Sequence, residues 1–161
     1  CLLARGAASV LAVDVGYAQF SWALRQDARV RLLERTNIVD VPGAVGASVV
    51  DLAVCDVSFT SVLTVLPAVL ELLRPRGTFL TLVKPQFEAA REDVGAGGVV
   101  RERAVRLAAL DRVAGAFCQG GLGLCGACES PIRGHKGNVE YLLLGVRGAA
   151  SLPLDEVMAG L

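Results

Sequence analysis

The chain has 161 residues, which is enough for one domain with a substantial hydrophobic core. A hydrophobic content of 53% excludes a disordered protein, and the lack of any run of about eighteen apolar residues excludes a membrane-spanning helix. Sixteen basic and sixteen acidic side chains balance, whereas free-standing nucleic-acid-binding proteins usually carry a basic excess. Any contact with RNA must therefore be local or assisted by another part of the protein.

The first part of the chain alternates between apolar runs and amphipathic segments. Hydrophobic residues at every position or every second position predict strands, and a spacing of three or four predicts helices. In order, we expect a helix end at Leu2–Gly6, a strand at Ser9–Val15, a short helix at Ala18–Asp27, a strand at Val30–Arg35, a loop at Gly43–Gly46, a strand at Val49–Val57, and a helix at Val62–Leu73 that Pro67 kinks or starts.

The next strand delivers a lysine to its end. The turn signal Arg74–Gly77 precedes an apolar run, Thr78–Val83, that is typical of a strand buried on both faces of a sheet. Pro85 cannot donate to a ladder, so the strand is expected to stop at Lys84. The carboxyl ends of parallel strands are where open α/β sheets place their chemistry. The alternative is a lysine that leaves the core only to meet water.

The remaining elements complete an α/β pattern. We expect a glycine-rich loop at Phe87–Val100, a helix at Arg101–Cys118, a strand at Leu122–Ile132, a turn at Arg133–Gly137, a strand at Asn138–Val146 and a tail at Ala149–Leu161 with no evident partner. Strands alternate with helices until the last two strands, which meet across a short turn. The sequence therefore predicts a mostly parallel sheet covered on both faces, with an antiparallel hairpin at one edge.

Five cysteines, an odd and scattered set, indicate a reducing cytoplasm. By residue type, the ligands of a zinc site could be Cys118, Cys125, Cys128 and His135. Against this, Cys125 and Cys128 lie in a predicted strand, where their odd separation sends them to opposite faces. We therefore favour buried apolar cysteines and expect no metal.

Charged residues end three of the predicted strands. Asp14 could accept hydrogen bonds from both hydroxyls of a ribose, or it could cap the following helix. Asp56 and Lys84 would pair if their strands are adjacent, and Glu140 would join them if the last strand runs beside the Lys84 strand. A Lys–Asp–Glu set of this kind fits the orientation or deprotonation of a weak hydroxyl nucleophile. It fits a structural salt-bridge network equally well.

Several strings of the sequence resemble one family. AVDVGYAQFSWALRQDARVRLLERTN, DLAVCDVSF, LVKPQFE, the VGAGGVVR loop and SPIRGHKGNVEYLL occur in the order found in TlyA-type proteins, which also carry an older label as haemolysins. The likeness covers a domain of residues 1–147, followed by a tail of residues 148–161. It implies a Rossmann-like class I methyltransferase fold of the FtsJ type. It also implies transfer of a methyl group from S-adenosylmethionine to a ribose 2′-hydroxyl of ribosomal RNA.

The resemblance also implies roles for individual residues. That family uses a Lys-Asp-Lys-Glu tetrad, whose last three members match Asp56, Lys84 and Glu140. Lys84 would orient the 2′-hydroxyl and help to remove its proton, supported by the two acids. The residues that would contact the cofactor are Asp14, Asn37, Asp40 and Asp56, and those that would border the RNA are Phe87, Arg133 and Lys136.

Other family features would precede Cys1: the first strand, the glycine-rich cofactor loop, the first tetrad lysine and a small S4-like RNA-binding domain. That first strand would lie between the Asp14 strand and the Asp56 strand. We therefore expect residues 1–161 alone to bind S-adenosylmethionine weakly and to be inactive, which isothermal titration tests. The alternatives are a non-catalytic RNA- or nucleotide-binding relative and a membrane-active haemolysin. The lack of a membrane span and of a basic amphipathic helix argues against the latter.

Overall fold

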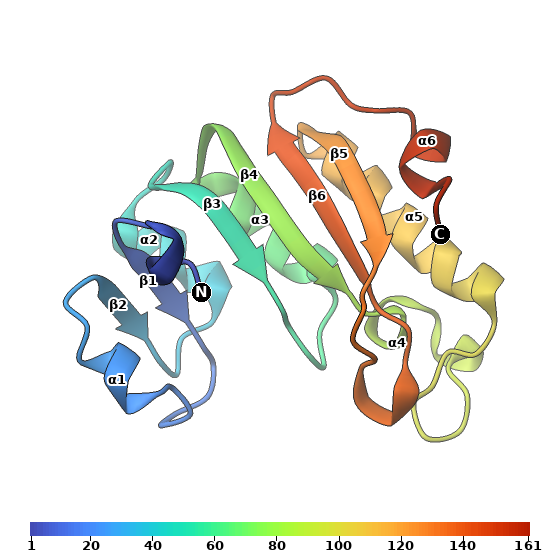
Figure 1. Cartoon of the computed structure of the whole chain (residues 1–161), viewed down its shortest axis with the longest axis horizontal. Helices are drawn as coiled ribbons and strands as arrows, with labels where there is room; N and C mark the ends of the chain where they lie inside the picture. Colours follow the sequence, from blue (N-terminus) through green and yellow to red (C-terminus); the bar gives the residue numbers. More distant parts are fainter. The chain divides into compact units, whose positions relative to one another are not determined.

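A computed structural model describes residues 1–161. The chain divides into two compact units, residues 1–46 and residues 47–161. Figure 1 shows the smaller unit in blue to cyan and the larger one in the colours that follow. None of the helices is long and apolar enough to cross a lipid bilayer.

The smaller unit is built on two parallel strands. Its elements are η1 (Leu3–Arg5), β1 (Val10–Val13), α1 (Trp22–Arg25), β2 (Val30–Leu33), η2 (Ile38–Asp40) and α2 (Val41–Val45). β1 and β2 pair from Val10 with Val30 to Val13 with Leu33. The predicted helix end is present, because Gly6 closes η1 in the left-handed conformation at φ +96°. The predicted loop at residues 43–46 is wrong, since α2 occupies it with a proline in its first turn, where the missing N–H costs no helical bond.

The larger unit contains a mixed four-stranded sheet. Its elements are β3 (Val50–Cys55), α3 (Val62–Leu72), β4 (Leu73–Val83), α4 (Pro85–Glu88), η3 (Arg91–Asp93), α5 (Arg103–Gln119), β5 (Leu122–Glu129), η4 (His135–Gly137), β6 (Tyr141–Arg147) and α6 (Leu154–Met158). The strand order is β3-β4-β6-β5. β3 and β4 are parallel, and β6 is antiparallel to both β4 and β5. The predicted α/β architecture, a parallel core with a carboxyl-terminal antiparallel hairpin, is confirmed.

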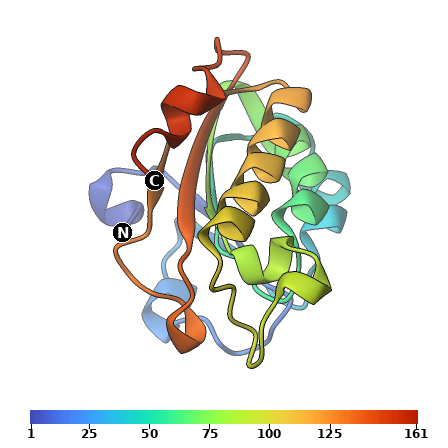
Figure 2. The ribbon, with the colours of Figure 1, turned by 90° about the vertical axis from the view of Figure 1, so that its right-hand side faces the viewer.

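The core lies between this sheet and the helices α3 and α5, which cover the same face (Figure 2). Alternate residues of β4 point into it, and Phe79 and Val83 are fully buried. The Phe79 ring stacks on Phe117 of α5 with 5.1 Å between the ring centroids. Gly145 of β6 leaves room for that ring, because a Cβ there would lie 2.9 Å from Phe117. Because Val83 is the last residue of β4, its burial in this core anchors the strand end that Lys84 follows.

The predicted turn at Arg74–Gly77 is an irregular part of β4 instead. Val50 pairs with Leu73 and Leu52 pairs with Thr78, so Arg74–Gly77 lie opposite a single residue of β3. Arg76 has a left-handed backbone at φ +65°, as expected where extra residues must be accommodated in a ladder. Turn-forming residues here produce a bulge because the pairing continues on both sides of them.

The tail, for which the sequence predicts no partner, folds against the edge strand β5. Leu152 donates its N–H to the carbonyl of Leu124 at 2.9 Å, and Ser151 Oγ accepts the N–H of Leu124 at 3.0 Å. Val157 of α6 is 6% exposed and joins the core of the larger unit. The tail therefore satisfies part of a strand edge that would otherwise be open.

Candidate functional site

The ends of three strands meet at one edge of the four-stranded sheet. β3 and β4 are parallel and end at Cys55 and Val83, so Asp56 and Lys84 follow at the same edge. β6 runs the opposite way, and its first residue, Tyr141, pairs with Val83. Lys84 is the residue that follows β4, and Glu140 is the residue that precedes β6. Directly opposed residues of antiparallel strands place their side chains on the same face.

Lys84 is held between two residues that follow β3. Its Nζ lies 2.6 Å from Asp56 Oδ1 and donates to Ser58 Oγ at 2.9 Å. The Lys84 side chain is 12% exposed, while that of Asp56 is 69% exposed. An ammonium group has three N–H donors, so these two contacts leave one. The pairing expected between Asp56 and Lys84 is therefore present, with Ser58 as an additional partner.

Glu140 is placed beside this pair without contacting it. The residue is 6% exposed, and its Oε1 accepts a hydrogen bond from Gln86 Nε2 at 3.0 Å. No hydrogen bond or ion pair joins Glu140 to Lys84 or Asp56. The structure thus brings the three expected residues to one edge, and Glu140 bonds there to Gln86, which lies two residues after Lys84.

Two aromatic rings extend the same edge. Phe59 follows β3 and contacts Phe87 of α4 with 5.4 Å between ring centroids. Phe59 is 92% exposed, and its backbone is left-handed at φ +63°, a conformation that large side chains rarely adopt. An exposed aromatic ring held in such a conformation is a candidate surface for a flat ligand.

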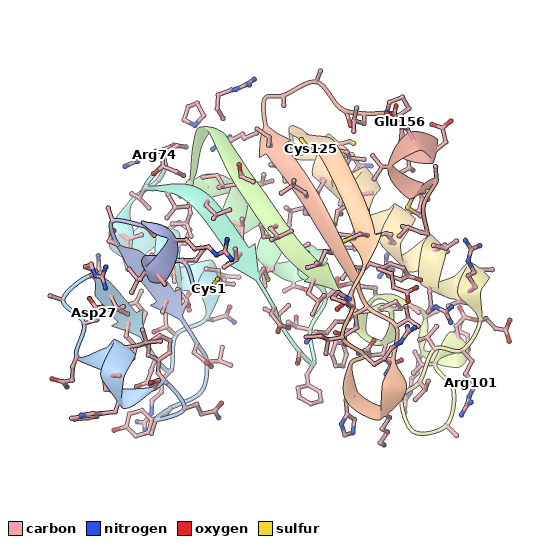
Figure 3. All side chains as sticks on the ribbon, in the orientation of Figure 1. Cys1, Asp27, Arg74, Arg101, Cys125 and Glu156 are labelled. Carbon is pink, nitrogen blue, oxygen red and sulfur yellow. The ribbon has the colours of Figure 1, made fainter.

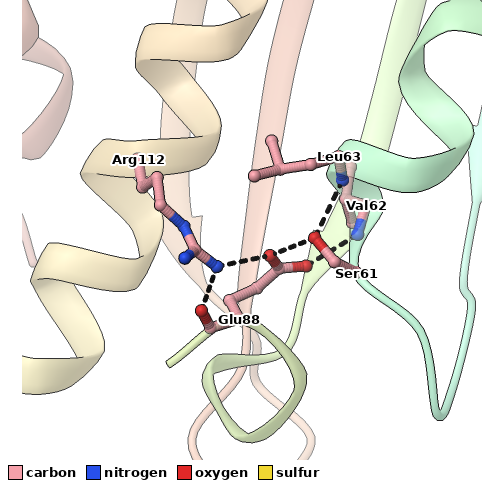
Figure 4. Close-up of polar contacts among 5 residues, drawn as sticks. All are labelled: Ser61, Val62, Leu63, Glu88 and Arg112. Carbon is pink, nitrogen blue, oxygen red and sulfur yellow. Dashed lines mark hydrogen bonds and ion pairs between the residues drawn. The ribbon is translucent and has the colours of Figure 1, made fainter. Parts of the chain in front are cut away.

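A buried carboxylate joins the segment that follows β3 to the segment that follows β4 (Figure 4). Glu88 is 2% exposed, and it accepts hydrogen bonds from Ser61 Oγ at 2.6 Å and from the N–H of Val62 at 2.7 Å. Arg112 of α5 approaches the same carboxylate at 3.3 Å. Because Val62 is the first residue of α3, the carboxylate satisfies one of the N–H groups that a helix start leaves free.

The loop before α5 and the turn before β6 form a basic border next to this edge. Arg133 and Lys136 are exposed in the turn, and Arg133 pairs with Glu129 at 3.0 Å. Arg101, labelled in Figure 3, is exposed at the end of the loop. Asn138, which is 3% exposed, binds the two segments together: it accepts the N–H of Val100 at 3.1 Å and donates to the carbonyl of Gly98 at 2.8 Å.

The predicted cofactor residues other than Asp56 lie in the smaller unit. Asp14 and Asn37 follow β1 and β2, and both are exposed. Asp14 Oδ1 accepts the N–H of Gly16 at 2.7 Å, and Asn37 Oδ1 accepts the N–H of Val39 at 3.2 Å. Each side chain keeps its other polar atom available, and Asp40 is exposed within η2. These groups fit the hydroxyl and amine groups of a nucleoside.

Five residues of the site were not singled out from the sequence: Ser58, Phe59, Gln86, Glu88 and Asn138. Each lies within one of the strings that carry the family resemblance. Their residue types alone give no signal, because an isolated glutamine, serine or asparagine in a loop is usually a surface residue. Only their contacts reveal them.

Comparison with known proteins identifies the family. The family model of FtsJ-like methyltransferases matches residues 1–147. The chain is 47% identical to the 16S/23S rRNA (cytidine-2′-O)-methyltransferase TlyA of Mycobacterium tuberculosis, covering 88% of this chain and 53% of that protein. It is 38% identical to Hemolysin A of Brachyspira hyodysenteriae, covering 88% of this chain and 60% of that protein.

A solved structure has the same fold. The chain superposes on a structure titled "Putative hemolysin from Streptococcus thermophilus" with a TM-score of 0.90 and 38% identity, covering 98% of this chain and 59% of that one. The chain spans about half the length of the curated relatives it matches. The family resemblance inferred from the sequence motifs is therefore confirmed, and the chain belongs to the FtsJ-like methyltransferase family.

Proposed function

We propose that the protein containing this chain transfers a methyl group from S-adenosylmethionine to a ribose 2′-hydroxyl of ribosomal RNA. The observation that carries this proposal is the nearly buried Lys84 amine, held by Asp56 and Ser58 at the carboxyl ends of parallel strands. Membership of a methyltransferase family and 47% identity to an rRNA 2′-O-methyltransferase support it.

The reaction requires a base at the hydroxyl. A bond forms between the 2′-oxygen and the methyl carbon as the bond from that carbon to sulfur breaks, and the hydroxyl proton must leave. Lys84 in its amine form can accept a hydrogen bond from the hydroxyl and take the proton. The ammonium that results is stabilised by the Asp56 carboxylate, which lies 2.6 Å from Nζ. Ser58 fixes the direction of the amine.

Glu140 would act from the other side of Lys84. Its carboxylate lies at the end of β6 that is opposite Lys84, and it is buried, so its negative charge is little screened by water. We infer that it helps to keep the amine directed toward the hydroxyl.

The smaller unit would hold the cofactor through groups that follow β1 and β2. We propose that Asp14 accepts hydrogen bonds from the ribose hydroxyls and that Asn37 and Asp40 lie at the adenine. The free carboxylate oxygen of Asp14 and the free amide nitrogen of Asn37 support this assignment. When bound, the cofactor supplies a methyl group on a positively charged sulfur.

The RNA would be bound by the aromatic pair and the basic border. Phe59 and Phe87 offer a surface on which a nucleobase can stack, and Arg133 and Lys136 offer charges for phosphates. The S4-like RNA-binding domain that the resemblance implies remains a prediction. Ribosomal RNA is proposed as the partner.

Lys84→Ala in the complete encoded protein tests the proposal. We expect methyl transfer to ribosomal RNA to fall by at least about 100-fold, the usual effect of removing a general base, while the cofactor dissociation constant changes less than about threefold. Resistance of the modified nucleotide to alkaline hydrolysis identifies a ribose 2′-O-methyl product. Arg74→Ala, at the opposite end of β4, is the control and should keep wild-type activity.

Full activity of the Lys84→Ala protein would remove Lys84 from the mechanism. A complete wild-type protein that binds ribosomal RNA and transfers no methyl group would instead support a non-catalytic RNA-binding relative. Product on a base nitrogen or carbon would contradict the assignment to ribose.

A further inference from the structure

The carboxylate of Glu140 fills the space that a side chain at Gly134 would need. A Cβ built on Gly134 would lie 2.0 Å from Glu140 Oε1 and 2.5 Å from its Cδ. Gly134 has ordinary extended dihedral angles, φ −72° and ψ −175°, which any residue can adopt. Glycine is therefore required at this position by the neighbouring carboxylate rather than by the backbone.

Gln86 contacts the same carboxylate from α4. Its Nε2 donates to Glu140 Oε1 at 3.0 Å. Its own Oε1 is buried and has no hydrogen-bond partner. Rotating the amide by half a turn would place that oxygen against a carboxylate oxygen, which is repulsive, so Glu140 determines the amide orientation. A buried amide that leaves one atom unsatisfied indicates that the bond to Glu140 outweighs this cost.

We propose that Gly134 and Gln86 are positioning residues that seat the Glu140 carboxylate beside Lys84. This inference rests on the proposed function, because it gives Glu140 a role in the same proton transfer. The two residues come from opposite sides: Gly134 belongs to the turn before β6, and Gln86 lies two residues beyond Lys84. We call these two contacts of the Glu140 carboxylate, with Gly134 and with Gln86, the seat. The seat links the position of Glu140 to the turn that contains Lys136 and to the segment that contains Lys84.

A single methyl group at Gly134 would disturb this arrangement selectively. Cβ atoms essentially never come within 3.0 Å of a heavy atom, so the carboxylate must move by about 1 Å. A misplacement of that size in a catalytic group can cost about 100-fold in rate. The moving atoms are the end of one flexible side chain, so the fold itself should tolerate the change.

Gly134→Ala in the complete protein is the main test, with Gly126→Ala as the matched control. Gly126 has nothing within 4 Å of its added Cβ and lies in β5. We expect Gly134→Ala to lower kcat by about 10- to 100-fold. The KM for RNA and the cofactor dissociation constant should stay within about threefold, and Gly126→Ala should keep wild-type kcat.

Gln86→Met and a double variant provide independent readouts. Gln86→Met keeps the side-chain size and removes the donor, and we expect a fall in kcat of about tenfold. Gln86→Glu should lower kcat further, because it places a second carboxylate against Glu140. In a Glu140→Gln background, Gly134→Ala should cause little additional loss, since both changes act through the same carboxylate.

The outcomes separate this inference from the proposed function. If Glu140→Gln loses activity while Gly134→Ala and Gln86→Met keep wild-type kcat, the seat is refuted and the proposed function stands. Additive losses in the double variant would also refute it. If Glu140→Gln keeps wild-type kcat, the seat has no catalytic role, and Lys84→Ala alone decides the proposed function. Should Gly134→Ala fail to fold, Gln86→Met decides.

Discussion

Ser61 Oγ donates a hydrogen bond of 2.6 Å to the buried carboxylate of Glu88, and this bond joins the far ends of two loops. One loop begins at Asp56 and the other at Lys84, and these residues form an ion pair at 2.6 Å. The loops also touch in the middle, through the rings of Phe59 and Phe87. The segments after β3 and β4 are therefore fastened to each other along their whole length.

Replacing Glu88 should destabilise the larger unit. Glu88→Ala leaves Ser61 Oγ and the N–H of Val62 without their acceptor, and we expect a loss of about 2–3 kcal/mol in the free energy of unfolding. Glu88→Gln keeps an acceptor and should cost less. Urea unfolding followed by circular dichroism measures both. Glu92→Gln, an exposed carboxylate in η3, is the control, and an equal effect of both glutamine variants would contradict the role of burial.

Replacing Phe59 should weaken RNA binding without lowering the stability of the fold. Its left-handed backbone costs about 1–2 kcal/mol for a large side chain, whereas asparagine tolerates this conformation. Phe59→Asn relieves that strain, but it also loses the ring contact with Phe87, which contributes roughly 0.5–1.5 kcal/mol. Phe59→Asn should therefore leave thermal stability unchanged or slightly higher, while RNA affinity falls by about tenfold through lost stacking.

Phe59→Trp is the matched variant for that prediction, because it keeps an aromatic face at the same position. Its RNA affinity should stay close to wild type in a filter-binding titration. If Phe59→Asn binds RNA as tightly as Phe59→Trp, the ring does not contact RNA.

Asp27 should titrate at unusually low pH. The side-chain hydrogen bond from Arg29, helped by the backbone N–H of the same residue, lowers the pKa of Asp27 to about 2. A pKa that is lower in the folded than in the unfolded state stabilises the fold above the unfolded value, and this contribution disappears as the pH falls toward 2. NMR titration of the carboxyl carbon measures the midpoint. Arg29→Gln should return the midpoint toward about 4, and an unchanged midpoint would refute the assignment.

The thiol of Cys55 should react with an alkylating agent more slowly than the thiol of Cys128. Burial raises the pKa of the Cys55 thiol, and the nearby Asp56 charge acts in the same direction. Because the thiolate is the reactive form, alkylation by iodoacetamide at pH 8 should be slower at Cys55 than at the exposed Cys128. Mass spectrometry of timed samples gives both rates in one experiment. Equal alkylation rates at the two thiols in the folded protein would contradict this explanation. A rate difference that persists after unfolding would contradict it too, because burial is then lost.

The sequence by itself determined much of the local structure of the larger unit. The apolar run before Pro85 predicted that the strand would stop at Lys84, and β4 ends at Val83, the residue before it. The helical spacing of apolar residues predicted α3 and α5 within two residues of their observed ends. These features follow from contacts between near neighbours in the chain, which composition and periodicity record. The sequence also placed Asp56 and Lys84 at strand ends, and it predicted their pairing on the condition that the two strands are adjacent.

Only the tertiary structure decided how the remaining groups meet. The register that pairs Val83 with Tyr141 brings Lys84 and Glu140 to one edge, and it joins strands more than fifty residues apart along the chain. The bond from Gln86 to Glu140 depends on the same pairing. The space at Gly134 and the left-handed backbone of Phe59 arise from packing around them, and no local pattern encodes either one. Local sequence specifies which residues end a strand, and long-range packing decides which of those ends face each other.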